Sequence, residues 1–158
     1  MEGENESELE GYPKVVSYEC TKKIMNQMEN SISKISIEKN QGTRFFCKIL
    51  FPDNDNKLPV FITNNHVIKS DLLNKYNATI SLQIKGEKEE KKIYLNDRIK
   101  YTNEEYDITI IEIKEKDNID KKSFLKLDNI IIDDILENNN KNFQYKNQTI
   151  YIVQFPEG

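Results

Sequence analysis

The apolar residues near the start of the chain recur at the spacing of a helix. They follow one another in steps of four and then three, as on one face of an amphipathic helix. The series consists of Val16, Cys20, Ile24, Met28, Ile32 and Ile35. It predicts a helix over residues 14–36 that packs on the rest of the domain, with a partner-binding helix as the alternative. Residues 1–13 are acidic and contain two of the five glycines, so we expect a disordered tail there.

From residue 43 onward the pattern becomes that of β-strands. Residues 43–51 are rich in aromatic side chains and residues 58–63 form a second apolar run, with a polar turn between them, which predicts a hairpin. Residues 78–84 alternate between apolar and polar side chains, and residues 93–101 indicate a further, bent strand. Residues 107–114 have a nearly unbroken apolar centre, which predicts burial on both faces. Short strands joined by polar turns predict an all-β barrel or sandwich.

The last part of the chain has a different character. Residues 129–147 combine an apolar patch with the polar run Glu137–Lys141, and they predict a connection that leaves the barrel. Residues 148–158 begin another apolar strand and then reach a turn signal at Pro156. Because an apolar strand with unpaired edges needs a partner, we interpret this segment as the start of a second unit.

Composition and charge narrow the range of functions. The chain has 158 residues, the size of one domain or slightly more. Its net charge of −4 provides no basic surface, so we expect no nucleic-acid partner. No apolar run approaches the length of a membrane span, and the acidic N-terminus lacks the apolar stretch of a secretion signal. We therefore expect no membrane association and a cytoplasmic location.

The cysteines offer little chemistry. Cys20 and Cys47 are the only two, so one disulfide is possible on paper, but they make no disulfide framework. Two distant cysteines and a single histidine do not form a convincing zinc site. Cys47 lies in the middle of a predicted strand, with no helix N-terminus to lower the pKa of its thiol, so it is not a candidate nucleophile. We expect neither a metal nor a cofactor.

The only histidine of the chain occupies a conspicuous place. His66 follows an apolar strand and a short polar turn, and Asp107 stands at the beginning of another apolar strand. Histidine is the side chain best suited to act as a base near neutral pH. A base and a carboxylate at two strand ends are two members of a three-residue hydrolytic device. The third member, a serine in a Gly-x-Ser-Gly turn, does not occur in this sequence.

Three segments carry this chemistry in a fixed order. They are Gly42-Thr43-Arg44-Phe45-Phe46-Cys47, Ile62-Thr63-Asn64-Asn65-His66-Val67 and Tyr106-Asp107-Ile108-Thr109-Ile110. Together they resemble the first half of a trypsin-like (chymotrypsin-fold) serine peptidase domain, and the resemblance covers residues from about 40 to 158. It implies a six-stranded antiparallel Greek-key barrel over residues 37–128, preceded by the amphipathic helix. Residues 129–147 would then connect two barrels, and residues 148–158 would be the first strand of a truncated second barrel.

The resemblance also implies roles for the two residues. His66 would be the general base of a Ser-His-Asp triad, and Asp107 would orient its imidazole. In this family the serine, the oxyanion hole and the substrate pocket belong to the second barrel, so we expect the chain to be inactive alone. Completed by a second barrel, it would act on a peptide or protein substrate. The alternative is a non-catalytic β-barrel interaction module or pseudopeptidase that retains His66 and Asp107 as relics.

Two positions depart from the pattern of the family. Arg44 stands where the family usually has glycine, and we expect it either to strain that corner or to project into solvent. Val67 stands where secreted members carry a cysteine after the histidine. Cys47 therefore lacks the usual partner, and we expect it to be a free thiol in the core.

Overall fold

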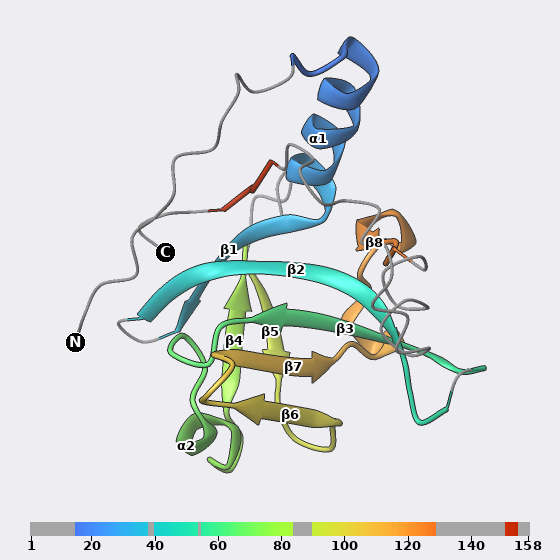
Figure 1. The fold of residues 1–158 in the computed structure, drawn as a ribbon. Helices are drawn as coiled ribbons and strands as arrows, with labels where there is room; N and C mark the ends of the chain where they lie inside the picture. The colour runs from blue at the N-terminus through green and yellow to red at the C-terminus, as the bar shows by residue number, and fades with distance from the viewer. Residues whose placement is uncertain (1–14, 38–39, 54, 84–89, 129–150, 155–158) are drawn as a thin grey trace.

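The computed structural model describes residues 15–37, 40–53, 55–83, 90–128 and 151–154. In these residues one helix at the start precedes a curled, mostly antiparallel β-sheet that forms a half-barrel (Figure 1). None of the helices in this part of the chain combines the length and the apolar character needed to cross a lipid bilayer.

The helices and strands follow one another along the chain, with η marking short 3-10 helices. They are α1 (Tyr18–Asn30), β1 (Ile32–Ile37), β2 (Asn40–Leu50), β3 (Lys57–Thr63), α2 (Ser70–Leu73), β4 (Thr79–Leu82), β5 (Lys91–Tyr94), β6 (Lys100–Asn103), β7 (Ile108–Glu112), η1 (Glu115–Asp117), η2 (Lys121–Ser123) and β8 (Phe124–Leu125). The predicted tail over residues 1–13 and the predicted connection over residues 129–147 lie outside the described residues.

The order of the strands requires the sheet to curl. The strands lie side by side in the order β5-β4-β1-β2-β3-β7-β6, and β8 pairs with β2 in parallel. The two end strands, β5 and β6, are consecutive in the sequence and are joined by residues 95–99. Six strand spacings of about 4.8 Å would separate them by about 29 Å in a flat sheet. Because a link of this length reaches at most about 20 Å, the two ends must approach each other.

Alternate residues of the strands fill the inside of the curled sheet. Ile80 and Leu82 are buried at the predicted alternation in β4, and Phe46 and Phe61 lie opposite each other on β2 and β3. The cluster of buried apolar residues comprises Ile35, Ile37, Phe46, Phe61, Val67, Ile68, Leu73, Ala78, Ile80, Leu82, Ile93, Leu95, Ile111 and Ile113. This core joins β5, at one end of the sheet, to β7, the strand next to the other end.

The sequence predicted burial on both faces of strand β7, but the structure buries only one face. Thr109 and Ile111 point into the core and are fully buried, whereas Ile108 and Ile110 are partly exposed. The reason is that the outer face of this part of the sheet borders an open cavity, to which Ile108 contributes. The apolar run of β7 therefore serves a core on one side and a cavity wall on the other.

The N-terminal helix is shorter than predicted. It ends at Asn30, so Ile32 and Ile35, which the helical spacing placed on the helix face, lie in strand β1 instead. Three of the six residues 32–37 are isoleucine, and β1 pairs with both β2 and β4. Pairing on both edges of a β-branched segment satisfies its backbone and outweighs the helical spacing.

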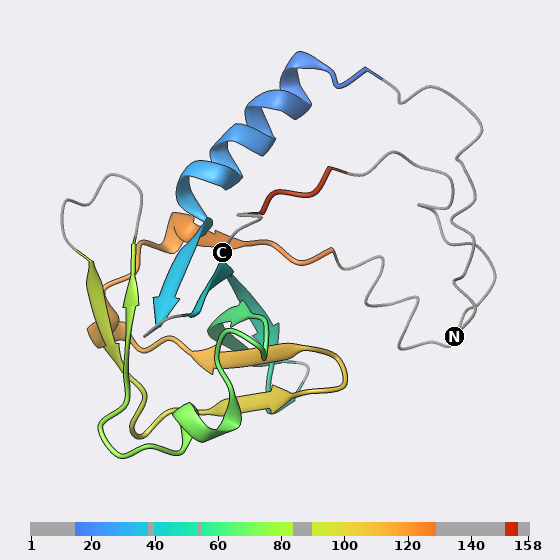
Figure 2. The same ribbon diagram turned by 90° about the vertical axis from the view of Figure 1, so that its left-hand side faces the viewer.

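Helix α1 also does not pack along the barrel. It extends away from the sheet, and its main contacts are with β1 and η2 (Figure 2). None of its residues is buried, and Tyr18 and Met25 are exposed. The helix begins at a Ser17 cap, whose hydroxyl oxygen accepts the N–H of Cys20 at 3.2 Å. Its stability therefore comes from local capping more than from tertiary burial.

The hairpin that the sequence predicted is confirmed. Strands β2 and β3 pair antiparallel from Arg44 opposite Thr63 to Leu50 opposite Lys57. In the turn between them, the Asp53 carboxylate accepts backbone N–H groups from the residues that follow it, so the acidic side chain shapes the turn.

Two other strand predictions differ from the structure. Residues 93–101 were predicted to form one bent strand, but they take part in two strands, β5 and β6, because residues 95–99 turn the corner between the sheet ends. Residues 148–158 were predicted to form a strand, but residues 151–154 form no strand. The rest of that range lies outside the described residues.

Candidate functional site

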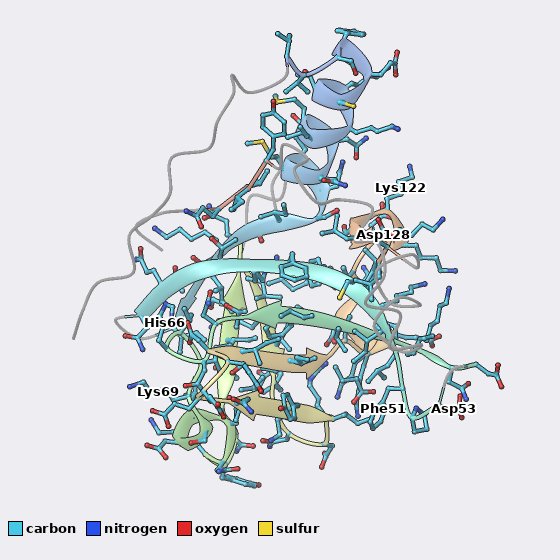
Figure 3. All side chains as sticks on the ribbon, in the orientation of Figure 1. Phe51, Asp53, His66, Lys69, Lys122 and Asp128 are labelled. Carbon is cyan, nitrogen blue, oxygen red and sulfur yellow. The ribbon has the colours of Figure 1, made fainter. Side chains whose placement is uncertain are left out.

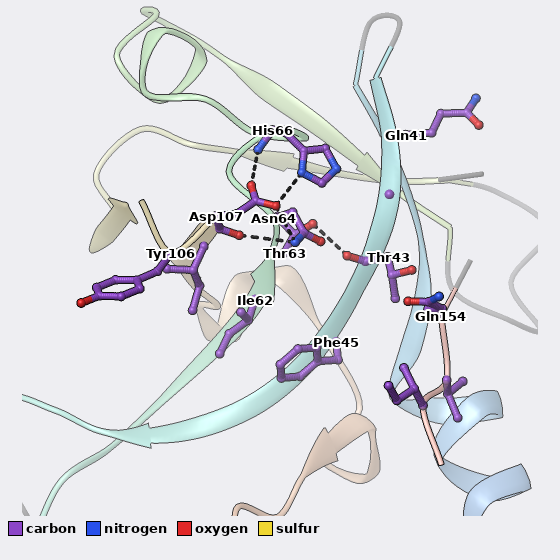
Figure 4. A pocket seen from close by; sticks show the side chains of 14 residues that line it. Gln41, Thr43, Phe45, Ile62, Thr63, Asn64, His66, Tyr106, Asp107 and Gln154 are labelled. Atoms are coloured by element: carbon purple, nitrogen blue, oxygen red, sulfur yellow. Dashed lines mark hydrogen bonds and ion pairs between the residues drawn. The ribbon is translucent and has the colours of Figure 1, made fainter. Parts of the chain in front are cut away.

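His66 and Asp107 meet at one edge of the sheet. His66 lies in the turn after β3, and Asp107 immediately precedes β7. These strands are neighbours, and Thr63 lies opposite Thr109, so the end of one strand meets the beginning of the other. The imidazole Nδ1 of His66 is 2.7 Å from Oδ2 of Asp107 (Figure 4). The structure thus brings together the two residues that the sequence singled out.

The position of the pair within the hairpin is also clear. His66 lies at the opposite end of the β2–β3 hairpin from the turn that contains Phe51 and Asp53 (Figure 3). Asp53 is therefore separated from the pair by the length of the hairpin.

The backbone holds the Asp107 carboxylate as firmly as the imidazole does. The backbone N–H of His66 donates to Oδ1 at 2.9 Å, while the ring contacts Oδ2 of the same carboxylate. The Asn64 Nδ2 donates to Oδ2 at 3.0 Å. Asp107 has a φ of 47°, a left-handed conformation that aspartate tolerates better than most residues. One carboxylate thereby accepts three donors from the turn that carries His66.

Asn64 was not singled out from the sequence. The only local signal is that two asparagines, Asn64 and Asn65, precede His66, and short amide side chains beside a candidate base are able to donate to its acid partner. Which of the two reaches Asp107 depends on the geometry of the turn, which the sequence pattern alone does not fix.

The hydrogen bonds keep the Asp107 carboxyl ionised. Partial burial raises its pKa, but the His66 backbone N–H, the His66 ring and the Asn64 amide together lower it below its usual value. An ionised carboxylate only accepts hydrogen bonds, so the proton shared with it belongs to Nδ1 of His66. In the neutral ring this leaves Nε2 as the free base.

Burial anchors the turn on the C-terminal side of His66. Val67 and Ile68 are buried in the core, and both of their N–H groups donate to the Asn64 carbonyl at 3.2 Å. Gly42 on β2 lies against this turn, because a Cβ atom there would be 2.4 Å from Val67 Cγ2. The glycine of the first motif therefore allows β2 to approach the turn that carries His66.

An open cavity of about 740 Å³ borders the pair (Figure 4). One wall is apolar and contains Phe45, Ile62 and Ile108. The described residues that line the cavity are Gln41, Gly42, Thr43, Phe45, Ile62, Thr63, Asn64, His66, Tyr106, Asp107, Ile108, Ile152, Val153 and Gln154. Apart from His66 and Asp107, the described residues of this lining carry no acidic or basic side chain.

Arg44 does not project into solvent. Only 1% of its surface is exposed, and its guanidinium carbon lies 4.0 Å from the centre of the Phe46 ring. Its φ is not among the left-handed values in the described residues, so no strain of that kind arises at this corner. The reason for the burial is that Arg44 and Phe46 share the inner face of β2, where the ring supports the cation. Burial lowers the pKa of Arg44 to about 9.

Cys47 is a free, buried cysteine, as predicted. Burial raises the pKa of its thiol to about 11, so the thiol stays protonated near neutral pH. The described residues also contain no group of three or more His, Cys, Asp or Glu side chains arranged to hold a metal ion.

The hydrogen-bonded pair, its three-donor carboxylate and the bordering cavity together define the candidate site. Comparisons of this chain with protein-family models, with curated proteins and with solved structures find no match.

Proposed function

We propose that His66 and Asp107 are the base and the acid of a Ser-His-Asp triad in the first barrel of a trypsin-like serine peptidase domain. The observation that carries this proposal is the 2.7 Å contact between His66 Nδ1 and Asp107 Oδ2, reinforced by the 2.9 Å bond from the His66 backbone N–H. In such a triad the carboxylate fixes the ring through Nδ1, and Nε2 removes the proton of the serine hydroxyl.

The order of the strands supports the same proposal. The order β4-β1-β2-β3 places the fourth strand beside the first, which is the Greek-key arrangement. Strands β5 and β6 are consecutive segments at the two ends of the sheet. Counted as the two halves of one bent strand, they reduce the sheet to six strands whose ends join. A six-stranded Greek-key barrel of the trypsin-like type accounts for this arrangement.

The proposed reaction needs a serine from outside this chain. The serine Oγ would attack the carbonyl carbon of a peptide bond while Nε2 of His66 takes its proton. The same proton would then pass from Nε2 to the leaving amine. Asp107 would remain ionised throughout and stabilise the imidazolium that forms between the two transfers. The substrate of the completed domain would be a peptide or protein, bound along the cavity beside the pair.

The test uses the full-length protein that contains this chain and a fluorophosphonate probe, which reacts with activated serines. We expect labelling of the wild type, loss of labelling in His66→Ala, and strong loss in Asp107→Asn. Lys69→Ala serves as the control, because Lys69 is exposed close to the turn but does not line the cavity. Equal labelling of wild type and His66→Ala would refute the triad. No labelling of the folded wild type would favour the non-catalytic interaction module.

A further inference from the structure

A chain of hydrogen bonds lies behind the turn that carries His66. Nδ2 of Asn65 donates to Oγ1 of Thr102 at 2.6 Å. The hydroxyls of Thr102 and Thr109 are 2.8 Å apart, and Oγ1 of Thr109 donates to the carbonyl of Ile68 at 2.8 Å. Asn65 and Thr109 are both buried, so water competes little for these groups.

The donors and acceptors that are present set the direction of the bonds in this chain. A carbonyl only accepts, so the single hydroxyl proton of Thr109 goes to Ile68. Thr109 then accepts from Thr102 at 2.8 Å, a shorter contact than the 3.4 Å from the Thr102 hydroxyl to the competing Ile108 carbonyl. A lone pair of Thr102 accepts the Asn65 amide. Each hydroxyl gives one hydrogen bond and receives one, and such chains strengthen each of their members. The chain begins at an amide donor and ends at a backbone acceptor.

The two ends of this chain lie on either side of His66. Asn65 precedes the histidine and Ile68 follows it by two residues, whereas Thr109 lies on β7 two residues after Asp107. Thr102 on β6 is the cross-strand partner of Thr109. The chain therefore ties both sides of the turn that carries the base to the strand that carries the acid.

We propose that Asn65, Thr102 and Thr109 form a positioning relay that holds the His66 imidazole against Asp107. The pair needs such support, because 65% of the His66 side chain and 43% of the Asp107 side chain are exposed. Attraction between exposed charged groups fixes geometry only weakly. The catalytic meaning of the relay rests on the proposed function, but its effect on the imidazole does not depend on a nucleophile.

The tautomer of His66 distinguishes a positioning role from a merely structural one. The ring nitrogen that carries the proton is set by the hydrogen bond that the ring makes. The chain has one histidine, so protein labelled with ¹⁵N-histidine gives a single pair of ring-nitrogen signals. In the neutral form of the ring, we expect Nδ1 to be protonated and Nε2 to be unprotonated in the wild type. A loosened turn would shift this population even if the fold survived.

The experiment compares Thr109→Val, Thr109→Ser and Thr63→Val by ¹⁵N NMR. Losing one buried hydrogen bond should lower the ratio of the Nδ1–H to the Nε2–H tautomer about threefold or more in Thr109→Val. Thr109→Ser retains the hydroxyl and should restore the wild-type ratio. Thr63→Val is the matched control, because the Thr63 hydroxyl donates to the Thr43 carbonyl at the same 2.8 Å but lies outside the relay. It should leave the ratio unchanged.

Two results would overturn the relay. One is an unchanged tautomer ratio in folded Thr109→Val, and the other is an equal change in Thr63→Val. If Thr109→Val does not fold, Thr102→Val and Asn65→Leu replace it, because each interrupts the same hydrogen-bond chain nearer its amide donor. The tautomer ratio of these variants then confirms or overturns the relay in the same way. Fluorophosphonate labelling of the full-length wild type is measured separately. The relay can thus fail while the triad stands, and the triad can fail while the tautomer effect remains.

Discussion

Gly42→Ala is the substitution that most directly tests how β2 supports the turn that carries His66. A Cβ atom at Gly42 would lie 2.4 Å from Val67 Cγ2 and 3.4 Å from Val67 Cβ. Val67 is 1% exposed and directly follows His66, so we expect any shift of its side chain to move the turn. The backbone of Gly42 is not in the left-handed region, so the expected effect is steric alone.

The structure allows an estimate of the size of this effect. Carbon atoms pack at about 3.5–4.0 Å, so Val67 would have to recede by more than about 1 Å. Overpacking of this kind costs about 1–3 kcal/mol. Alanine also restricts the unfolded chain, which returns about 0.4–1 kcal/mol. We therefore expect Gly42→Ala to lower the free energy of unfolding by about 0–2.6 kcal/mol, with about 1.3 kcal/mol as the middle of this range.

The assay is a double-mutant cycle measured by denaturant unfolding. Val67→Ala alone should cost about 2–3 kcal/mol, for two methyl groups and the cavity they leave. It also removes the methyl group that a residue 42 side chain would meet. In that background Gly42→Ala should be neutral or stabilising by up to about 1 kcal/mol. An equal cost of Gly42→Ala in both backgrounds would refute the steric argument, because coupling between contacting residues is what the cycle isolates.

Three further predictions concern charged groups. Arg98→Met should lower the free energy of unfolding by about 3–5 kcal/mol. The Arg98 guanidinium donates from Nη1 and Nη2 to the buried carboxylate of Asp117 at 2.5 and 2.6 Å, and the substitution leaves that charge without its partner. A loss of less than about 1 kcal/mol in thermal unfolding would contradict this prediction. Arg44→Met should raise the free energy of unfolding by about 1–3 kcal/mol, because Nε and Nη1 of Arg44 are buried without a hydrogen-bond partner among the described residues. A lower stability of the variant in denaturant unfolding would contradict this prediction. The lowered pKa of Asp107 means that the unfolded state takes up its proton first as the pH falls through about 4, so stability decreases there. Asn64→Ala should make that decrease shallower in acid titrations of stability, and an unchanged slope would contradict the role of the amide.

The sequence predicted an element correctly where only one periodic pattern was present, and failed where a helical and a strand pattern competed in the same segment. The β2–β3 hairpin and the alternation in β4 follow from period-two patterns that nothing else in the segment opposes. The spacing of Ile32 and Ile35 favoured a helix, whereas the β-branched isoleucines of residues 32–37 favoured a strand. The strand prevailed because β1 finds partners on both of its edges, a contribution that only the tertiary fold supplies.

The same distinction applies to the site. His66 and Asp107 were identifiable because each stands at the end of a strand with a recognisable apolar pattern. The bond between Thr102 and Thr109 depends on the register of β6 against β7, which is set by the whole sheet. The sequence could have predicted that Arg44 points inward, because it lies two residues from Phe46 and therefore on the same face of the strand. A charged residue is rarely expected in a core, however.

Because the His66–Asp107 pair is exposed, the surrounding residues of the barrel must fix its geometry. An ion pair with this much exposure is worth about 0–1 kcal/mol, so mutual attraction does not explain the 2.7 Å contact. The His66 N–H, the Asn64 amide and the buried Val67 explain it, since each fixes the turn or the carboxylate independently of charge. Charge becomes effective only where water is excluded. If the proposed function is correct, the surface that brings the serine must therefore also cover the cavity, and its apolar wall of Phe45, Ile62 and Ile108 is suited to that contact.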